Sequence, residues 1–76
     1  MEKVNKIMTA LGNKPLVCMS RESENEFKFT FVGGLFKALD RLVYIESMID
    51  KYLGNEYNIQ TIYGEGLDVT FKITEK

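Results

Sequence analysis

The chain has 76 residues, with 10 basic and 11 acidic side chains, a net charge of −1 and no histidine. Its length predicts a single domain over residues 1–76, and its 45% of hydrophobic residues is ample for a globular core. The balanced charge argues against a dedicated nucleic-acid binder, which normally carries a basic excess, and against an anionic-membrane binder. One cysteine and no histidine exclude an internal disulfide and a histidine-containing zinc site, so stability must come from packing or from packing with self-association.

Targeting and membrane signals are missing from the sequence as given. The N-terminal residues contain no continuous apolar run that could form the core of a signal peptide. The longest hydrophobic stretch, residues 35–53, is interrupted by six charged side chains and is not expected to span a membrane. A lone cysteine favours a reducing compartment. We therefore expect a cytoplasmic protein.

The first predicted element is a helix over residues 2–11. Its apolar residues recur at helical spacing along one stripe, which consists of Val4, Ile7, Met8 and Leu11. Gly12 and Asn13 predict a left-handed end to this helix, and Pro15 prevents its continuation.

A hairpin follows, with a short strand over 16–20, a polar loop over 21–25 and a longer strand over 26–32. Residues 27, 29 and 31 are all phenylalanine, and this period of two places three rings on one sheet face. Cys18 lies between two apolar residues and is expected to be a small core residue, because a buried free cysteine behaves as a small hydrophobe.

A second helix and a second hairpin follow. Two glycines precede a helix predicted over 35–53, and Gly54 with Asn55 again predicts a left-handed cap. Strands are predicted over 57–63 and 67–74, joined by a tight loop whose glycines permit positive φ. In the last strand the apolar residues at 67, 69, 71 and 73 face one way, which marks it as half-buried.

The element order α-β-β-α-β-β predicts an α+β domain with a four-stranded, mainly antiparallel sheet and two helices packed on one face. The long helix joins two hairpins and must therefore cross one face of the sheet. The opposite, open face is expected to carry residues suited to solvent or a polar contact: Lys28, Thr30, Val32, Asn58, Gln60, Ile62, Thr70 and Lys72. The order of the strands in space does not follow from the sequence.

The sequence contains no recognisable catalytic constellation. Without histidine, the commonest general acid–base is missing and no Cys-His or Ser-His pair can form. The Gly33-Gly34 turn lacks both the Lys-Ser/Thr pair of a phosphate-binding loop and the spaced glycines of a dinucleotide motif. We therefore predict a non-enzymatic protein without a cofactor or a metal.

Glu46 and Asp50 are the strongest carboxylate candidates for a binding site, because their i, i+4 spacing places them on one helix face near its apolar sector. They could form a cation site or an acidic recognition patch. Two carboxylates alone are too few for a dedicated metal cage. The favoured interpretation is a solvated helix edge.

The helix predicted over 35–53 carries more apolar surface than a single sheet can bury. One stripe suits the sheet and contains Leu35, Ala38, Leu39, Leu42, Ile45, Ile49 and Leu53. Two flanks are also apolar, with Phe36 and Val43 on one side and Met48 and Tyr52 on the other. Either the first helix and the chain ends cover both flanks, or one flank stays exposed and binds another chain.

By elimination, we expect a protein-interaction module that acts by steric binding to a larger protein. It could be an adaptor or a small inhibitor of a host or bacterial defence enzyme, of the kind that mobile elements encode, and a second copy of the chain is another candidate partner. The candidate partner-binding residues are Phe36, Val43, Tyr44, Glu46, Met48, Asp50 and Tyr52.

Two further surfaces could contact a partner. The strand edges, expected at the first and last strands, could pair with a strand from another chain. The alternative function is a nucleic-acid or small-ligand module that uses the open polar face. Nucleic acid is the weaker partner, because a binding face needs exposed aromatic residues interleaved with basic ones, and Lys28 and Lys72 are isolated.

Overall fold

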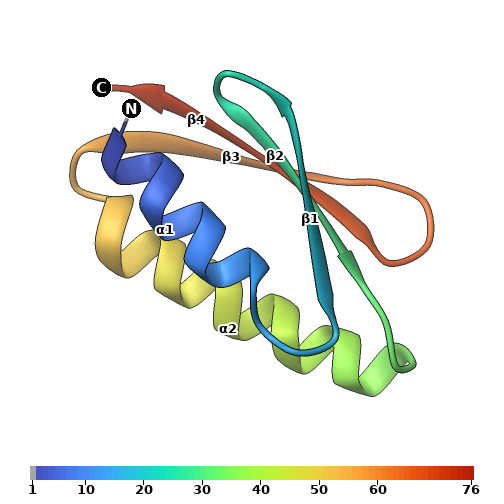
Figure 1. Cartoon of the computed structure of the whole chain (residues 1–76). Helices are drawn as coiled ribbons and strands as arrows, with labels where there is room; N and C mark the ends of the chain where they lie inside the picture. The colour runs from blue at the N-terminus through green and yellow to red at the C-terminus, as the bar shows by residue number, and fades with distance from the viewer. Residues whose placement is uncertain (1) are drawn as a thin grey trace.

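The computed structural model describes residues 2–76. Its elements follow in the order α1 (Glu2–Gly12), β1 (Val17–Ser23), β2 (Glu26–Phe31), α2 (Leu35–Leu53), β3 (Tyr57–Tyr63) and β4 (Asp68–Glu75). This confirms the predicted α+β class, and both helices lie on one face of the sheet (Figure 1). None of the helices in the described residues has the length and hydrophobicity that a membrane crossing requires.

The sheet is antiparallel and has the strand order β1-β2-β4-β3. The two hairpins therefore meet through β2 and β4, and the edges are β1 and β3. The expectation that the last strand forms an edge is wrong, because β4 pairs with β2 on one side and with β3 on the other.

The core lies between the helices and the two central strands. All three phenylalanines of β2 are at most 3% exposed, and Val69, Phe71 and Ile73 of β4 are at most 4% exposed. Phe29 and Phe71 pack edge to face, with ring centroids 5.5 Å apart and an angle of 83° between the rings. The helices contribute Val4, Met8, Leu11, Ala38, Ile45, Ile49 and Leu53 to the core. The alternation in both strands thus predicted the buried face correctly.

The sheet-facing stripe of α2 is shorter than predicted. Ala38, Ile45, Ile49 and Leu53 are buried, and Leu42 is half-buried. Leu35 and Leu39 are instead 60% and 48% exposed. The first turns of α2 diverge from the β3–β4 hairpin, so these two side chains line a groove and are not packed in the core (Figure 1).

The first hairpin differs from the sequence prediction in its bounds. β1 begins at Val17, because Leu16 adopts a left-handed φ of 65° that no strand accommodates. The predicted loop over 21–25 shrinks to Glu24 and Asn25, and the preceding polar residues pair with β2 through a bulge between Arg21 and Ser23. The Arg21 guanidinium donates hydrogen bonds to the carbonyls of Ser23 and Glu24 at 3.1 and 2.8 Å, which hold this turn closed.

Cys18 is exposed, which corrects its expected place in the core. It pairs with Thr30 of β2, whose side chain belongs to the open face. Val17 is buried and Met19 packs against the core, on the opposite face of the same strand. The alternation along β1 therefore directs the cysteine outward.

The predicted left-handed helix ends are also wrong. Gly54 has a right-handed conformation, φ −61° and ψ −26°, and its N–H donates to the Asp50 carbonyl at 2.9 Å. Gly12 and Asn13 are likewise absent from the positive-φ residues of the described chain, which are Leu16, Gly33, Gly34 and Gly66. Glycine is needed at position 12 because there is no room for a side chain. A Cβ there would lie 2.6 Å from the Cβ of Met19 in β1.

Gly12→Ala is therefore expected to lower the free energy of unfolding by about 1–3 kcal/mol, because α1 and β1 must move apart. Alanine favours helix formation over glycine by about 1 kcal/mol, so a loss of stability would show that the contact with Met19 dominates. Urea denaturation followed by circular dichroism measures the difference. An unchanged or raised stability would contradict this close packing.

Candidate functional site

The side of α2 that faces α1 is covered in part. Met48 is half-buried in a hollow that Ile7 and Leu11 of α1 also line. At the rim, Tyr44 and Tyr52 remain 40% and 50% exposed. The Lys14 ammonium lies 5.7 Å from the centre of the Tyr44 ring. Three of the predicted partner-binding residues, Tyr44, Met48 and Tyr52, therefore belong to the contact between the two helices and its rim.

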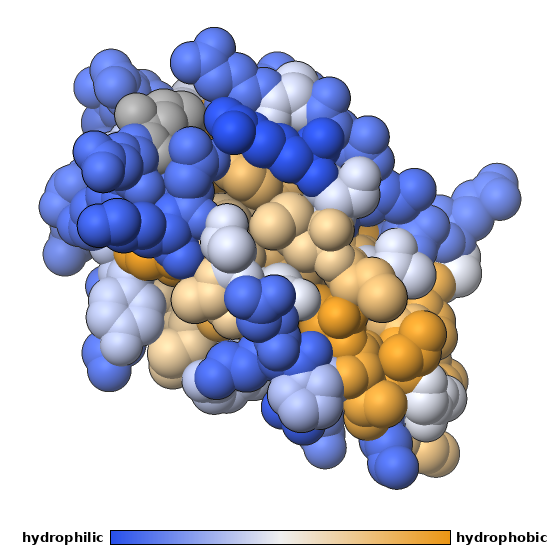
Figure 2. All heavy atoms as spheres, in the orientation of Figure 1, coloured by the Kyte–Doolittle hydropathy of each residue, from blue (hydrophilic) through white to orange (hydrophobic). Residues whose placement is uncertain are grey.

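The opposite side of α2 has no such cover. Its residues are spaced so that they adjoin on one helix face. Together with one aromatic residue of β3 they form what we call the apolar patch: Leu35 at 60% exposure, Phe36 at 85%, Leu39 at 48%, Val43 at 64% and Tyr63 at 64%. On the face that carries α1 and β1, Figure 2 shows that hydrophobic side chains are exposed over the first turns of α2 as well. The predicted residues Phe36 and Val43 thus lie on a surface with three further apolar members.

Two hollows follow one another between α2 and the β3–β4 hairpin, and we call them the α2–β3 groove. The first, of about 200 Å³, runs along the apolar patch between Leu39 and Tyr63. Its other lining residues are mostly apolar and include Phe31, Leu42, Leu67 and Val69. This end of the groove offers a place for an apolar side chain.

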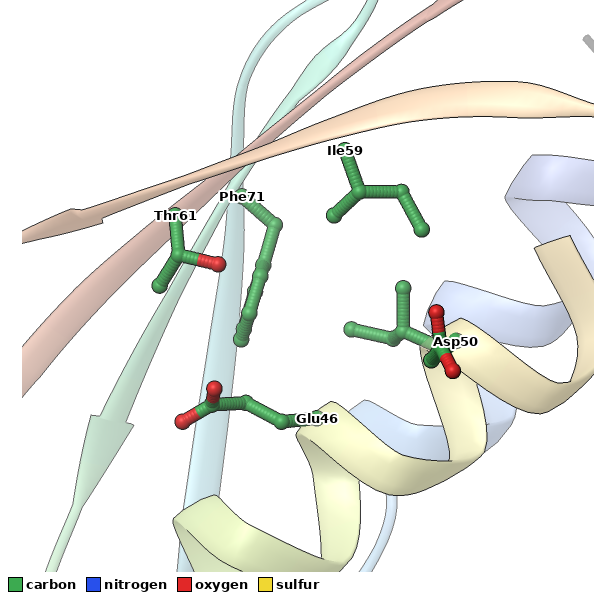
Figure 3. A pocket seen from close by; sticks show the side chains of 6 residues that line it. Glu46, Asp50, Ile59, Thr61 and Phe71 are labelled. Carbon is green, nitrogen blue, oxygen red and sulfur yellow. The ribbon is translucent and has the colours of Figure 1, made fainter. Parts of the chain in front are cut away.

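The second hollow is acidic. Glu46 and Asp50 line it from α2, opposite Ile59 and Thr61 of β3 (Figure 3). The Tyr63 hydroxyl donates a hydrogen bond of 3.5 Å to the Glu46 carboxylate. Among the described residues, neither carboxylate forms an ion pair.

The predicted carboxylate pair therefore faces a groove. Glu46 is half-buried, whereas Asp50 is exposed. No cluster of three or more potential metal ligands occurs in residues 2–76.

The two edges of the sheet differ in how well they are protected. β3, with the sequence YNIQTIY, has no charged residue, no proline and an uninterrupted register with β4. β1 contains Arg21 and Glu22 and is interrupted by a bulge. Charges and bulges are the usual protection of an edge strand against further pairing, so β3 is the unprotected edge. Sequence reasoning missed this feature, because the lack of charge in residues 57–63 signals an open edge only once the strand order is known.

The open face of the sheet carries polar and aliphatic side chains. One row across it, set by the strand register, contains Ser20, Lys28, Thr70 and Ile62. The Lys28 ammonium lies 3.6 Å from the Asp68 carboxylate, which offsets its charge. The face thus provides little of the positive charge and aromatic stacking that a nucleic-acid surface uses.

The chain matches no protein-family model and no curated protein.

Proposed function

We propose that the protein is a non-enzymatic interaction module that binds a larger protein sterically through the apolar patch. The observation that carries this proposal is the exposure of large apolar side chains along one uncovered side of α2, with Phe36 at 85%. A contiguous exposed apolar surface with polar residues around it commonly marks a binding site. Aromatic residues such as Phe36 and Tyr63 often supply most of the binding energy at an interface.

The proposed mode of action is occlusion of a surface on the partner. A domain of 76 residues without histidine has few means of acid–base chemistry at neutral pH, but it is large enough to block a site on another protein. A small inhibitor of a host or bacterial defence enzyme, of the kind that mobile elements encode, is the specific form of this proposal. Its place of action would be the cytoplasm.

Phe36→Glu is expected to abolish partner binding and to leave folding intact. The side chain is 85% exposed, so the free energy of unfolding should change by less than about 0.5 kcal/mol. A carboxylate in the patch would have to be desolvated against the partner's apolar surface, which is costly. The measurement is recovery of the partner from an extract of the native cell by the tagged protein, together with a thermal melt.

Cys18→Glu serves as the control. Cys18 is exposed on β1, which forms the edge of the sheet opposite β3 and carries no residue of the patch. This variant should retain the partner at the level of the parent protein. Equal recovery of the partner by the Phe36→Glu variant, or a protein that retains no partner at all, would contradict the proposed function.

A further inference from the structure

We propose that β3 binds the partner by strand addition, and that the added segment carries an apolar side chain followed by lysine or arginine at the next two alternate positions. This inference rests on the proposed function, since it names the chemistry of the partner that the apolar patch would contact. It is carried by three features: the free edge of β3, the groove beside it and the two carboxylates in that groove, which have no ion-pair partner among the described residues.

The backbone of β3 has the geometry for strand addition. The Gly64 N–H donates to the Asp68 carbonyl at 2.9 Å, which fixes the direction of the backbone groups at the end of β3. These groups alternate in direction along an antiparallel pair. The N–H and C=O groups of Gln60 and Ile62 therefore also point toward β4, whereas those of Ile59, Thr61 and Tyr63 point outward from the edge of the sheet. An extended segment that runs antiparallel to β3 can pair with them, meeting Tyr63 first, and place every second side chain on the helix-covered face.

The α2–β3 groove determines which side chains such a segment would need. A side chain beside Tyr63 would enter the hollow lined by Leu39, which is apolar. The next side chain on the same face would lie beside Thr61 and Glu46, and the following one beside Ile59 and Asp50 (Figure 3). The groove therefore selects an apolar residue and then two residues that complement carboxylates.

Charge decides between a different protein and a second copy of this chain. Glu46 and Asp50 have no basic partner among the described residues, so lysine or arginine from an added strand would supply one. Antiparallel pairing of β3 with its own copy about Gln60 would set Ile59 of each chain beside Thr61 of the other. That arrangement would bring the carboxylates of two α2 helices toward one another, and like charges across an interface are unfavourable.

A pair of synthetic peptides tests this directly. In both peptides every second side chain is intended for the helix-covered face, and the first of these is leucine. The next two of these side chains are lysine in one peptide and glutamate in its control. The lysine peptide should slow amide hydrogen exchange at Ile59, Thr61 and Tyr63. The glutamate peptide should bind at least about tenfold more weakly. Equal binding of both peptides, or protection confined to other residues, would overturn the proposal.

Two variants test the backbone and the charges separately. Thr61→Pro removes an outward N–H, which an edge strand tolerates when that side faces solvent, and should weaken binding of the lysine peptide by about tenfold or more. The double variant Glu46→Lys, Asp50→Lys should reverse the preference, so that the glutamate peptide binds more tightly. This reversal holds as a test even if the proline variant fails to fold. An unchanged preference in the double variant would overturn the proposal.

The outcomes also separate this inference from the proposed function. If Phe36→Glu loses the partner while the Thr61→Pro and charge-reversed proteins bind it as the parent does, strand addition is wrong and the apolar patch acts alone. If light scattering shows a dimer that Thr61→Pro converts to a monomer, the occupant of the edge is a second copy and the proposal is overturned. Loss of the partner in all three variants supports both the proposed function and strand addition.

Discussion

Phe29→Ala should lower the free energy of unfolding by about 3–5 kcal/mol, the usual cost of removing a buried aromatic ring. Phe29 is fully buried in the central strand β2, and its ring packs edge to face on Phe71 of β4. A domain of this size has a total stability of about 4–11 kcal/mol. The variant should therefore lose between about a quarter and all of its stability, which urea denaturation measures.

The matched control is Phe36→Ala, which removes the same ring from a position that is 85% exposed. Its free energy of unfolding should change by no more than about 0.5 kcal/mol. Similar losses in the two variants would mean that Phe36 contributes to the core, and the patch would then not be a free surface.

Ile45→Asp is expected to prevent folding, with a cost of at least about 4 kcal/mol. Ile45 is fully buried where α2 packs on the sheet, so an aspartate there would be an unpaired charge in the core. Circular dichroism and the dispersion of amide resonances would show the loss of the fold. A folded Ile45→Asp protein would contradict the orientation of α2 described above.

Val43→Asp is the corresponding control, two positions earlier on the same helix. Val43 is also β-branched but is 64% exposed on the apolar patch. The variant should remain folded with nearly the stability of the parent. The contrast between these two substitutions determines which side of α2 is free, independently of any partner.

Much of the fold follows from residue patterns that are local in the chain. The bounds of α2 and β3 agree with the predicted ranges, because glycines flank the helix and turn residues flank the strand. The phenylalanines at 27, 29 and 31 identified the buried face of β2, since one parity of a half-buried strand faces the core. These features need no knowledge of distant contacts.

The features that sequence reasoning missed depend on pairing between distant segments. Arg21, Glu22 and Ser23 suggest a loop by their polarity, but the register with β2 extends the strand through them. Cys18 faces outward because its partner in β2 is Thr30. The position of β4 between β2 and β3 could not be derived either, because the connections allow several strand orders.

The candidate site was predicted in part. The excess apolar surface of α2 was evident from the sequence, and Phe36 and Val43 lie on its uncovered side. The sequence could not show that α1 lies beside the flank of Met48 and Tyr52. Nor could it show that Glu46 and Asp50 face an edge strand, since that contact joins residues on two elements.

The central position of β4 has a consequence for how the protein is made. β4 is the last strand in chain order, yet within the described residues it is the only strand with which β3 pairs. Until β4 has emerged from the ribosome, β3 has no strand to pair with, and the phenylalanines of β2 lack their contacts with Val69 and Phe71. Cooperative folding must therefore wait until the last strand has emerged, and the chain cannot fold progressively from its N-terminus during translation.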